Sequence, residues 1–322
     1  MKIAFAGFRH GHIWGLYYSA LENPEVEVVG CFEADPEARA AAEEKTGSRF
    51  EFDAYEEILE NDEIDTVAIG DYYANRGQLA IKALQHGKHV ICDKPICTDL
   101  SELDEIERLS KEKNLQVSCM LDLRYIPHTA KAKEILESGV LGEIHNISFT
   151  GQHCLNYGSR PMWYFEEGKH GGTINDIAIH GVDLLRYLLD KDFTSIEYAK
   201  TWNAFATEKP EFKDCGQFIA KMDNITVNAD VSYAAPAFEA LPTYWRFEFW
   251  GSKGLMTFCY NEKQIHIYTN THEVIELENS KSEFLRDMLL EIKGENTILG
   301  RDGIIKSQRQ VLEIQKFAEK EN

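Results

Sequence analysis

Short apolar runs alternate with helical stretches through the first 120 residues, and this alternation constrains the fold more than any other feature. Lys2 to Ala6 and Val26 to Phe32 are typical of strands, and a stretch with helical spacing, His12 to Glu22, separates them. This pattern predicts βαβ units, a parallel sheet and, with right-handed crossovers, a doubly wound α/β fold. Further strands are expected at 66–70, 89–92 and 116–121, and helices at 36–46, 55–60, 75–85 and 101–113. Ser101 is the expected N-cap of the last helix, and Gly47 the expected end of the helix over 36–46.

The pattern changes near residue 123 to long runs of period two, which predict a mostly antiparallel sheet with one covered face. Helices are expected at 130–138 and 179–189, and two more from Ser282 and from Gly303. We therefore expect a dinucleotide-binding domain over 1–122 and an α+β domain over 123–322 for substrate binding and oligomerisation. The expected strands are 146–151, 195–206, 217–222, 226–233, 245–250, 255–260 and 264–268.

The charge balance argues against several classes of partner. Fifty-four acidic side chains against 34 basic ones give a net charge of −20 over 322 residues. Such a surface repels phosphate backbones and anionic lipid, so neither nucleic acid nor membrane is an expected partner. There is no apolar run of about 18 residues and no signal-peptide pattern, which favours the cytoplasm. Seven scattered cysteines without a CxxC pair fit reduced thiols there.

The first expected strand runs into the sequence GFRHGH, residues 7–12, where a dinucleotide fold usually carries G-x-G-x-x-G. Gly7 keeps the register, whereas Arg9 stands at the second glycine position and His12 at the third. The pattern alone leaves two interpretations open, a nucleotide site and an ordinary strand–turn–helix connection.

The end of the second expected strand favours the nucleotide interpretation. Glu33 follows Gly7 by 26 positions, about where an acidic residue accepts the ribose hydroxyls of a dinucleotide. Asp35, before Pro36, suits the N-cap of the next helix, which leaves Glu33 for the ribose. A carboxylate there repels a 2′-phosphate, so NAD is expected in preference to NADP.

Three side chains could form a set for proton transfer. Lys94 follows the expected strand over 89–92, at the sheet edge where open α/β folds bind ligands. Asp176 and His180 are four positions apart at the start of an expected helix, so they lie on one face. A histidine can accept a hydroxyl proton, a lysine can steady a developing alkoxide, and a carboxylate can orient the histidine. Taken singly, the lysine could be a solvated charge and the Asp–His pair a helix-surface pair.

These segments resemble the Gfo/Idh/MocA oxidoreductase family, which includes glucose–fructose oxidoreductase and inositol dehydrogenases. The family's G-K-H-V followed by E-K-P is similar to residues 87–90 and 93–95, with Asp for Glu. Its D-x-x-x-H is similar to residues 176–180, after a Gly-Gly pair. Residues 138–144 and the final helix after residue 302 also resemble the family, so the likeness spans nearly the whole chain.

The resemblance implies that Lys94 is the catalytic lysine, His180 the acid/base and Asp176 its partner. The implied reaction is NAD(P)-dependent oxidation of a secondary alcohol on a sugar or cyclitol, or the reverse reduction. His180 would take the hydroxyl proton while hydride passes to the nicotinamide, and Lys94 would hydrogen-bond the same oxygen. The family also implies a homodimer or homotetramer formed through the second sheet, with a small neutral polyol or sugar as substrate.

The candidate site residues follow from the residue patterns and from the family resemblance together. One departure concerns residues 71–76, DYYANR, which replace the family's T-P-x-x-x-H beside the cofactor. The candidate cofactor-binding residues are Gly7, Phe8, Arg9, His10, Glu33, Asp71, Tyr72, Asn75 and Lys94. The candidate substrate-binding residues are Lys94, Arg124, His153, Tyr157, Arg160, Trp163, Asp176 and His180. The residue types of His153, Cys154, His170, Asp176 and His180 could also suggest a metal site, but no tight ligand spacing supports one, so no metal is expected.

Two other functions remain open at this point. The altered nucleotide loop suits a Rossmann-type ligand-binding or regulatory protein that has lost its redox role. A branch of the family uses the cofactor for transient oxidation during glycoside cleavage, which is a third possibility. Polyol-dependent formation of NADH discriminates the dehydrogenase from both.

Overall fold

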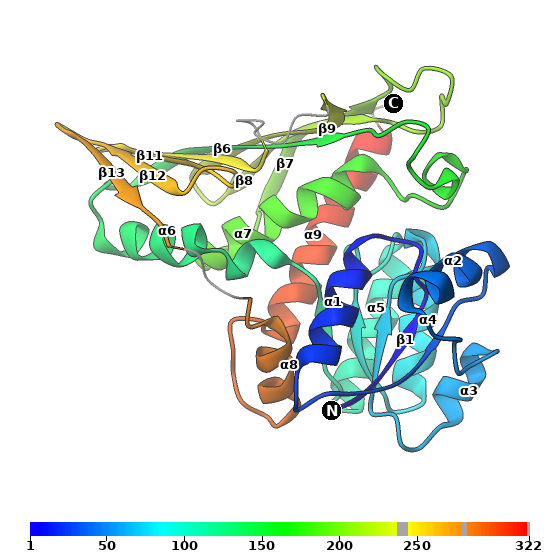
Figure 1. The fold of residues 1–322 in the computed structure, drawn as a ribbon. Coiled ribbons are helices and arrows are strands. Elements are labelled where there is room, and N and C mark those ends of the chain that lie inside the picture. Colours follow the sequence, from blue (N-terminus) through cyan, green and yellow to red (C-terminus); the bar gives the residue numbers. More distant parts are fainter. Residues whose placement is uncertain (237–243, 279–281, 321–322) are drawn as a thin grey trace. The chain divides into compact units, whose positions relative to one another are not determined.

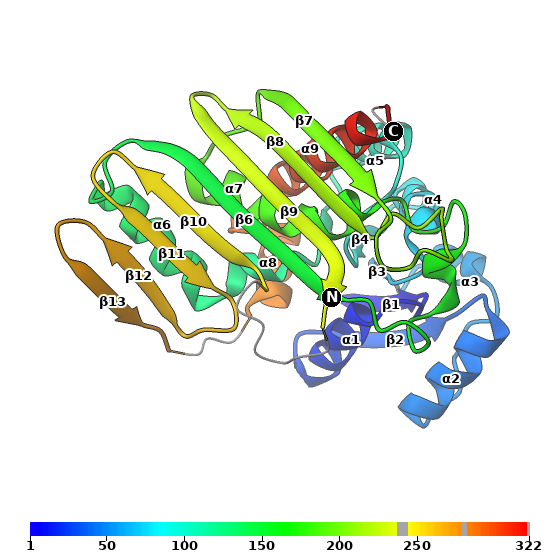
Figure 2. The same ribbon diagram turned by 90° about the horizontal axis from the view of Figure 1, so that it is seen from above.

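The computed structural model describes residues 1–236, 244–278 and 282–320, which fall into two compact units. Figures 1 and 2 show the elements of both units in two views. Unit 1 comprises Met1–Met120, Gly168–Gly171 and Glu283–Lys306. Unit 2 comprises Leu121–Glu167, Gly172–Ser282 and Ser307–Asn322.

Unit 1 is built on a five-stranded parallel sheet, which confirms the predicted doubly wound fold. Its strand order is β2-β1-β3-β4-β5, so β2 is added on one side of β1, and β3, β4 and β5 are added on the other. Helix α1 lies on one face of the sheet, and α4 and α5 lie on the other (Figure 1). The strands are β1 (Lys2–Ala6), β2 (Glu27–Phe32), β3 (Thr66–Ile69), β4 (His89–Cys92) and β5 (Val117–Cys119). The helices are α1 (His12–Glu22), α2 (Pro36–Thr46), α3 (Tyr55–Glu60), α4 (Tyr73–Gln85), α5 (Leu100–Glu112) and α8 (Phe284–Ile292).

Helix ends in unit 1 follow side-chain capping. Asp35 accepts the Ala38 N–H at 2.9 Å and starts α2, and Gly47 ends α2 with a φ of 69°, as the sequence predicts. The prediction that Ser101 caps α5 is wrong. The carboxylate of Asp99 accepts the Ser101 N–H at 2.7 Å, so the helix begins one residue earlier, at Leu100.

A segment late in the chain belongs to unit 1, so the division differs from the expected single boundary at residue 122. Hydrogen bonds from side chains to backbone carbonyls explain the difference. The Gln116 side chain donates to the Glu291 carbonyl at 3.1 Å, and the Arg301 side chain donates to the Leu115 carbonyl at 3.2 Å. These bonds join α8 and the residues after it to the residues just before β5.

Unit 2 is built on an eight-stranded sheet of order β13-β12-β11-β10-β6-β9-β8-β7. All neighbouring pairs are antiparallel except β6 and β9, which confirms the predicted mostly antiparallel sheet. The edge strand β13 was not predicted, because its side chains are nearly all exposed and carry no period-two signal. The strands are β6 (Ile144–Cys154), β7 (Ser195–Trp202), β8 (Cys215–Met222), β9 (Ile225–Ala235), β10 (Arg246–Gly251), β11 (Leu255–Cys259), β12 (Gln264–Tyr268) and β13 (His272–Glu276).

One face of this sheet is covered. Helices α6 (Pro127–Ser138) and α7 (Ile179–Leu189) lie against it, and no helix of the described residues covers the other face (Figure 1). Phe247 and Phe249 on β10 are fully buried, whereas Trp250 on the same strand is 48% exposed. The long last helix, α9 (Arg301–Lys320), has its final 14 residues, 307–320, in unit 2. In the described parts of the chain, no helix is long and apolar enough to cross a lipid bilayer.

Candidate active site

In the turn after β1, the backbone conformation requires glycine at the first position of the nucleotide motif. Gly7 has a φ of +88°, and a Cβ on it would lie 2.6 Å from the backbone nitrogen of Asp71. The Gly70 carbonyl accepts the N–H groups of Arg9 at 3.0 Å and His10 at 3.3 Å. The turn therefore lies against the carboxyl end of β3, where the strand order switches sides and open α/β sheets bind their ligands.

Gly11, which is out of register with the motif, occupies a different environment. It precedes α1 with a φ of −66°, and no heavy atom lies within 4 Å of where its Cβ would stand. The space beside the first turn of α1 is thus open within unit 1. A helix N-terminus with open space and a tight glycine turn before it fits a dinucleotide pyrophosphate.

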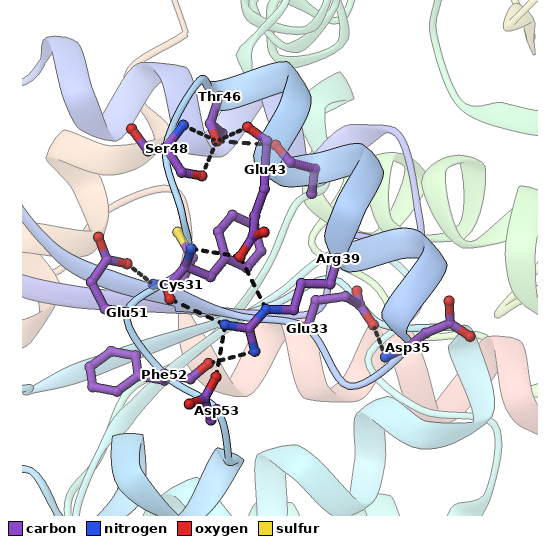
Figure 3. A network of polar contacts seen from close by, with 12 residues as sticks. Cys31, Glu33, Asp35, Arg39, Glu43, Thr46, Ser48, Glu51, Phe52 and Asp53 are labelled. Carbon is purple, nitrogen blue, oxygen red and sulfur yellow. Dashed lines mark hydrogen bonds and ion pairs between the residues drawn. The ribbon is translucent and has the colours of Figure 1, made fainter.

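Glu33 lies buried at the end of β2 and holds the nucleotide loop. Its carboxylate accepts the Phe8 N–H at 2.7 Å and the Asp35 N–H at 3.0 Å (the second bond is drawn in Figure 3). Burial raises the pKa of Glu33, although both backbone N–H groups lower it. The carboxylate was expected to be free for a ribose, and it instead already accepts two hydrogen bonds. Its remaining lone pairs can still accept from a hydroxyl.

Phe8 and Arg9 point to different surroundings. The Phe8 ring is buried in an aromatic cluster, with the ring centres of Trp14 and Phe50 at 4.8 and 5.0 Å. Its side chain therefore belongs to the core of unit 1, and only its backbone faces the loop. The Arg9 guanidinium lies 3.5 Å from the Asp35 carboxylate and 5.9 Å from the centre of the Tyr72 ring.

The loop after β3 is stabilised by its own polar groups. The buried Asp71 carboxylate accepts the Tyr72 N–H and the Asn75 side-chain N–H, both at 2.6 Å. The Lys169 ammonium lies 5.1 Å from the Tyr72 ring, and the Ala74 N–H donates to the Lys169 carbonyl. Asp71, Tyr72 and Asn75 are thus brought together beside the turn that holds Gly7.

Lys94 is buried directly after β4, and an arginine that the sequence reasoning missed holds its backbone. Arg76 donates from Nη1 to the carbonyls of Lys94 at 2.6 Å and Pro95 at 3.2 Å, and from Nε to the carbonyl of Asp71 at 2.7 Å. Arg76 is itself fully buried on α4. The signal for it was its position in the DYYANR segment, where the family carries histidine.

The carboxylate before Lys94 gathers three basic side chains. Asp93 Oδ2 lies 2.5 Å from His10 Nδ1 and 3.5 Å from Arg76 Nη2, and Asp93 Oδ1 lies 3.4 Å from His12 Nδ1. Burial lowers the pKa of His10 to about 3, against the raising effect of Asp93. Burial by itself would raise the pKa of Asp93, but His10 and Arg76 outweigh it and hold that pKa well below its usual range. Asp93 is therefore ionised at neutral pH.

In unit 2, Asp176 and His180 lie on one continuous helical segment, as predicted, but its first turn is unusual. Residues Ile174–Ala178 form a π-helical turn that runs into α7, a feature that is frequent at functional sites. Gln315 holds the start of this turn, accepting the Ile174 N–H at 3.0 Å, and it occupies the space where a Cβ on Gly172 would lie. Both candidate residues are buried.

Trp245 brings two of the predicted site residues together, and the sequence reasoning did not single it out. Its ring centre lies 5.2 Å from that of His180 and 5.5 Å from that of His153. Trp245 is buried with a φ of +50°, a conformation that is rare for a bulky residue. A Cβ on Gly151, which lies on β6, would be 2.8 Å from the Trp245 ring. The absence of a side chain at Gly151 therefore leaves room for the indole.

The remaining candidates of unit 2 are spread through it. Arg124 is buried and donates twice to Asp183, at 2.7 and 2.5 Å. Arg160 donates to two backbone carbonyls and lies 4.5 Å from the centre of the Tyr164 ring. Trp163 is buried, and Tyr157 is half exposed. Whether these residues bind substrate stays a prediction.

Comparison with protein-family models gives two matches. The model described as "Oxidoreductase family, NAD-binding Rossmann fold" matches residues 1–121, and "GFO/IDH/MocA C-terminal domain" matches residues 129–257. The chain belongs to the Gfo/Idh/MocA oxidoreductase family. The resemblance seen in the sequence is therefore confirmed, and the first unit carries the NAD-binding type of Rossmann fold.

Individual members of the Gfo/Idh/MocA family show how far the likeness reaches. A levoglucosan dehydrogenase of Pseudarthrobacter phenanthrenivorans is 30% identical over 53% of this chain and 44% of its own. A scyllo-inositol 2-dehydrogenase (NAD(+)) of Bacillus subtilis is 30% identical over 49% and 45%. The chain spans about half the length of the curated relatives that it matches. A putative oxidoreductase from Thermotoga maritima, 23% identical, shares the fold with a TM-score of 0.87 over 100% of this chain and 99% of its own.

Proposed function

We propose that this protein is an NAD-dependent dehydrogenase that oxidises a secondary alcohol of a neutral sugar or cyclitol, or catalyses the reverse reduction. The observation that carries the proposal is the buried Lys94 at the carboxyl end of β4, held there by Arg76. Membership of the oxidoreductase family supports it. The substrates in the names of two relatives, levoglucosan and scyllo-inositol, support the substrate class.

The nucleotide end of unit 1 supports NAD as the cofactor. The positive φ of Gly7, the crowding where its Cβ would stand and the open start of α1 fit a dinucleotide. Glu33 and the turn over residues 7–10 would hold it, together with Asp71, Tyr72 and Asn75. A carboxylate at the end of β2 disfavours a 2′-phosphate, which is the reason for NAD over NADP. Bound NAD supplies a nicotinamide that accepts or returns hydride.

The proposed roles of this chain's own residues follow from their chemistry. His180 takes the proton of the substrate hydroxyl, and the Lys94 ammonium donates a hydrogen bond to that oxygen as negative charge develops. Asp176 orients His180 from the preceding π turn. His153 contacts the Trp245 ring, as His180 does, and would donate or accept a hydrogen bond with a second hydroxyl of a polyol. Arg124, Tyr157, Arg160 and Trp163 complete the proposed substrate-binding set.

A panel of neutral polyols with NAD, followed at the NADH absorbance band, tests the proposal. Levoglucosan and scyllo-inositol are the first members to try. The proposal predicts turnover that falls by roughly a hundredfold or more in Lys94→Met and in His180→Asn. Lys82→Met and His145→Asn, at exposed positions, are the matched controls and should keep the wild-type rate. Unchanged turnover in Lys94→Met would refute the assignment.

The same panel separates the two competing functions. A regulatory or ligand-binding protein would bind a polyol without forming NADH. An enzyme of glycoside cleavage would release a free sugar from a glycoside without net NADH. Turnover that disappears when His180 is changed contradicts the first alternative, and net NADH contradicts the second.

We also propose a homodimer or homotetramer formed through the sheet of unit 2. The face without a helix carries apolar and aromatic side chains that are more than a third exposed: Tyr198, Ile219, Trp250, Tyr268 and Val274. Such a face gains stability when a second copy covers it. Light scattering of the full chain should give at least twice the mass of one chain, and a monomer at all concentrations would contradict this proposal.

A further inference from the structure

The nucleotide end of unit 1 contains a cluster of three side chains that could each ligate a metal ion. His10 and His12 come from the turn between β1 and α1, and Asp93 follows β4. One ligand atom from each, two imidazole nitrogens and a carboxylate oxygen, lie within 4.8 Å of one another. Asp93 is fully buried, His10 half-buried and His12 exposed. The cluster therefore lies against the protein interior at Asp93 and is open to solvent at His12.

The spacing of these atoms suits one small cation. Zn²⁺ binds imidazole nitrogen and carboxylate oxygen at about 2.0–2.2 Å, which sets ligand atoms roughly 3.4 Å apart around a tetrahedron. His12 Nδ1 already lies 3.4 Å from Asp93 Oδ1. His10 Nδ1 lies 2.5 Å from Asp93 Oδ2, a hydrogen-bond distance that would open as a bound ion takes the place of the shared proton.

A second observation points to a ligand that is not part of the chain. Asp93 Oδ1 is a buried carboxylate oxygen with no hydrogen-bond partner among the described residues. It faces His12 rather than Arg76, whose guanidinium lies on the Oδ2 side at 3.5 Å. A buried polar atom in this state lacks stabilisation that a hydrogen bond or an ion would supply. The positive charge of Arg76 would repel a metal cation. Arg76 and His10 both contact Oδ2 of Asp93, however, so Oδ1 is left to bind a metal ion.

We propose that His10, His12 and Asp93 form a binding site for one divalent transition-metal ion of the zinc class. Two imidazoles and a carboxylate are a ligand set that such ions prefer, and three protein ligands leave a coordination position for water or a small oxygen ligand. This proposal departs from the expectation of no metal. It also involves none of the five residues whose types suggest a metal site in the sequence. The site lies within unit 1 and adjoins Lys94 in the sequence.

Titration of the untagged full chain with Co²⁺ or Zn²⁺, after removal of metal by chelator, tests this site. The expected result is one equivalent bound, with the visible absorption bands of four-coordinate Co²⁺. His12→Ala should weaken binding by at least about tenfold, since a ligand is lost, and Asp93→Asn should abolish it. His12 is exposed, so its variant should keep the wild-type fold, which circular dichroism checks.

A control variant tests whether the metal binds at other histidines of the chain. His266 and His272, 3.2 Å apart on the β12–β13 hairpin, are the competing histidine pair, and their double alanine variant should bind metal like the wild type. Equal affinity in the wild type and His12→Ala, or binding lost only in the hairpin variant, would overturn the proposal. Because the titration needs neither NAD nor polyol, its outcome is independent of the dehydrogenase assignment.

Discussion

The guanidinium of Arg76 donates a 2.6 Å hydrogen bond to the carbonyl oxygen of Lys94, and both residues are buried. The same arginine also lies 3.5 Å from the Asp93 carboxylate. One side chain from α4 therefore fixes the backbone on which Lys94 stands and balances the neighbouring negative charge. We regard Arg76 as a positioning residue for Lys94.

Arg76→Met should destabilise the protein by about 3–5 kcal/mol, because it leaves Asp93 buried without its cation and removes the donor to three backbone carbonyls. Chemical denaturation measures the change. Arg108→Met, which removes an exposed arginine from α5, is the control and should leave the unfolding midpoint unchanged. Arg76→Lys keeps the charge and should retain the wild-type KM with a reduced kcat. An Arg76→Met variant with wild-type stability would contradict the role of Arg76 in holding the backbone at Lys94.

Gly7→Ala and Gly11→Ala should differ sharply although both lie in the GFRHGH loop. A Cβ at Gly7 would lie 2.6 Å from the backbone of Asp71, at a φ that side chains disfavour, whereas Gly11 has open space and a helical φ. We expect Gly7→Ala to lower both the melting temperature and the affinity for NAD. Gly11→Ala should keep the wild-type melting temperature. Thermal melts and NAD titrations of both variants measure these effects. Equal melting temperatures and equal NAD affinities in the two variants would refute the close packing of Gly7 against the chain after β3.

Glu33→Gln should weaken NAD binding several-fold. Each carboxylate oxygen of Glu33 accepts one backbone N–H, from Phe8 or from Asp35. The side-chain amide of glutamine has only one oxygen, so its NH₂ group would face one of these two N–H donors, and that hydrogen bond to the nucleotide loop would be lost. Fluorescence titration with NAD measures the effect, and Glu37→Gln in the first turn of α2 is the matched control. An unchanged dissociation constant in Glu33→Gln would show that the loop does not need this carboxylate.

His128 should make folding sensitive to mild acid. Burial lowers its pKa below 6.5, outweighing the bond from its ring to the Glu262 carbonyl at 2.6 Å and the nearby Glu262 charge. The folded state therefore favours the neutral ring, and its contribution to stability is complete above pH 6.5. That contribution is lost as the pH falls below 6.5, because the unfolded chain binds the proton more readily.

His128→Gln should accordingly reduce the fall in melting temperature between pH 7.5 and pH 5.5. The quantity to compare is the difference between variant and wild type, since carboxylates elsewhere titrate in both. His145→Gln, at an exposed position, should show the wild-type fall. A His128→Gln variant as acid-sensitive as the wild type would exclude this residue as a cause.

Local patterns predicted most of the fold because they act within one element. The apolar runs over β1 and β4 and the cap pair of Asp35 and Gly47 specify their elements from neighbours in the sequence. Asp99 was missed because Ser101 is an equally good cap by type. Which of two adjacent caps starts a helix depends on the backbone that precedes it.

Contacts between distant segments could not be predicted in the same way. Lys94, Asp176 and His180 are candidates from the sequence because they belong to short motifs, and their catalytic roles stay predictions. Arg76 donates to carbonyls 18 and 19 positions away, and Trp245, in the turn before β10, contacts both His153 and His180. The cluster of His10 and Asp93, 83 positions apart, forms only because β1 and β4 end at the same edge of the parallel sheet.

Transfer of hydride from a polyol carbon is the central claim, and isotope labelling measures it most directly. The panel polyol with the fastest turnover, carrying deuterium on its carbinol carbons, is incubated with the enzyme and NAD, and the NADH formed is analysed by mass spectrometry. We predict one deuterium atom in each NADH formed, with the rate of formation lowered roughly a hundredfold or more in His180→Asn. NADH without deuterium, or formation at the wild-type rate in His180→Asn, would contradict the proposed function.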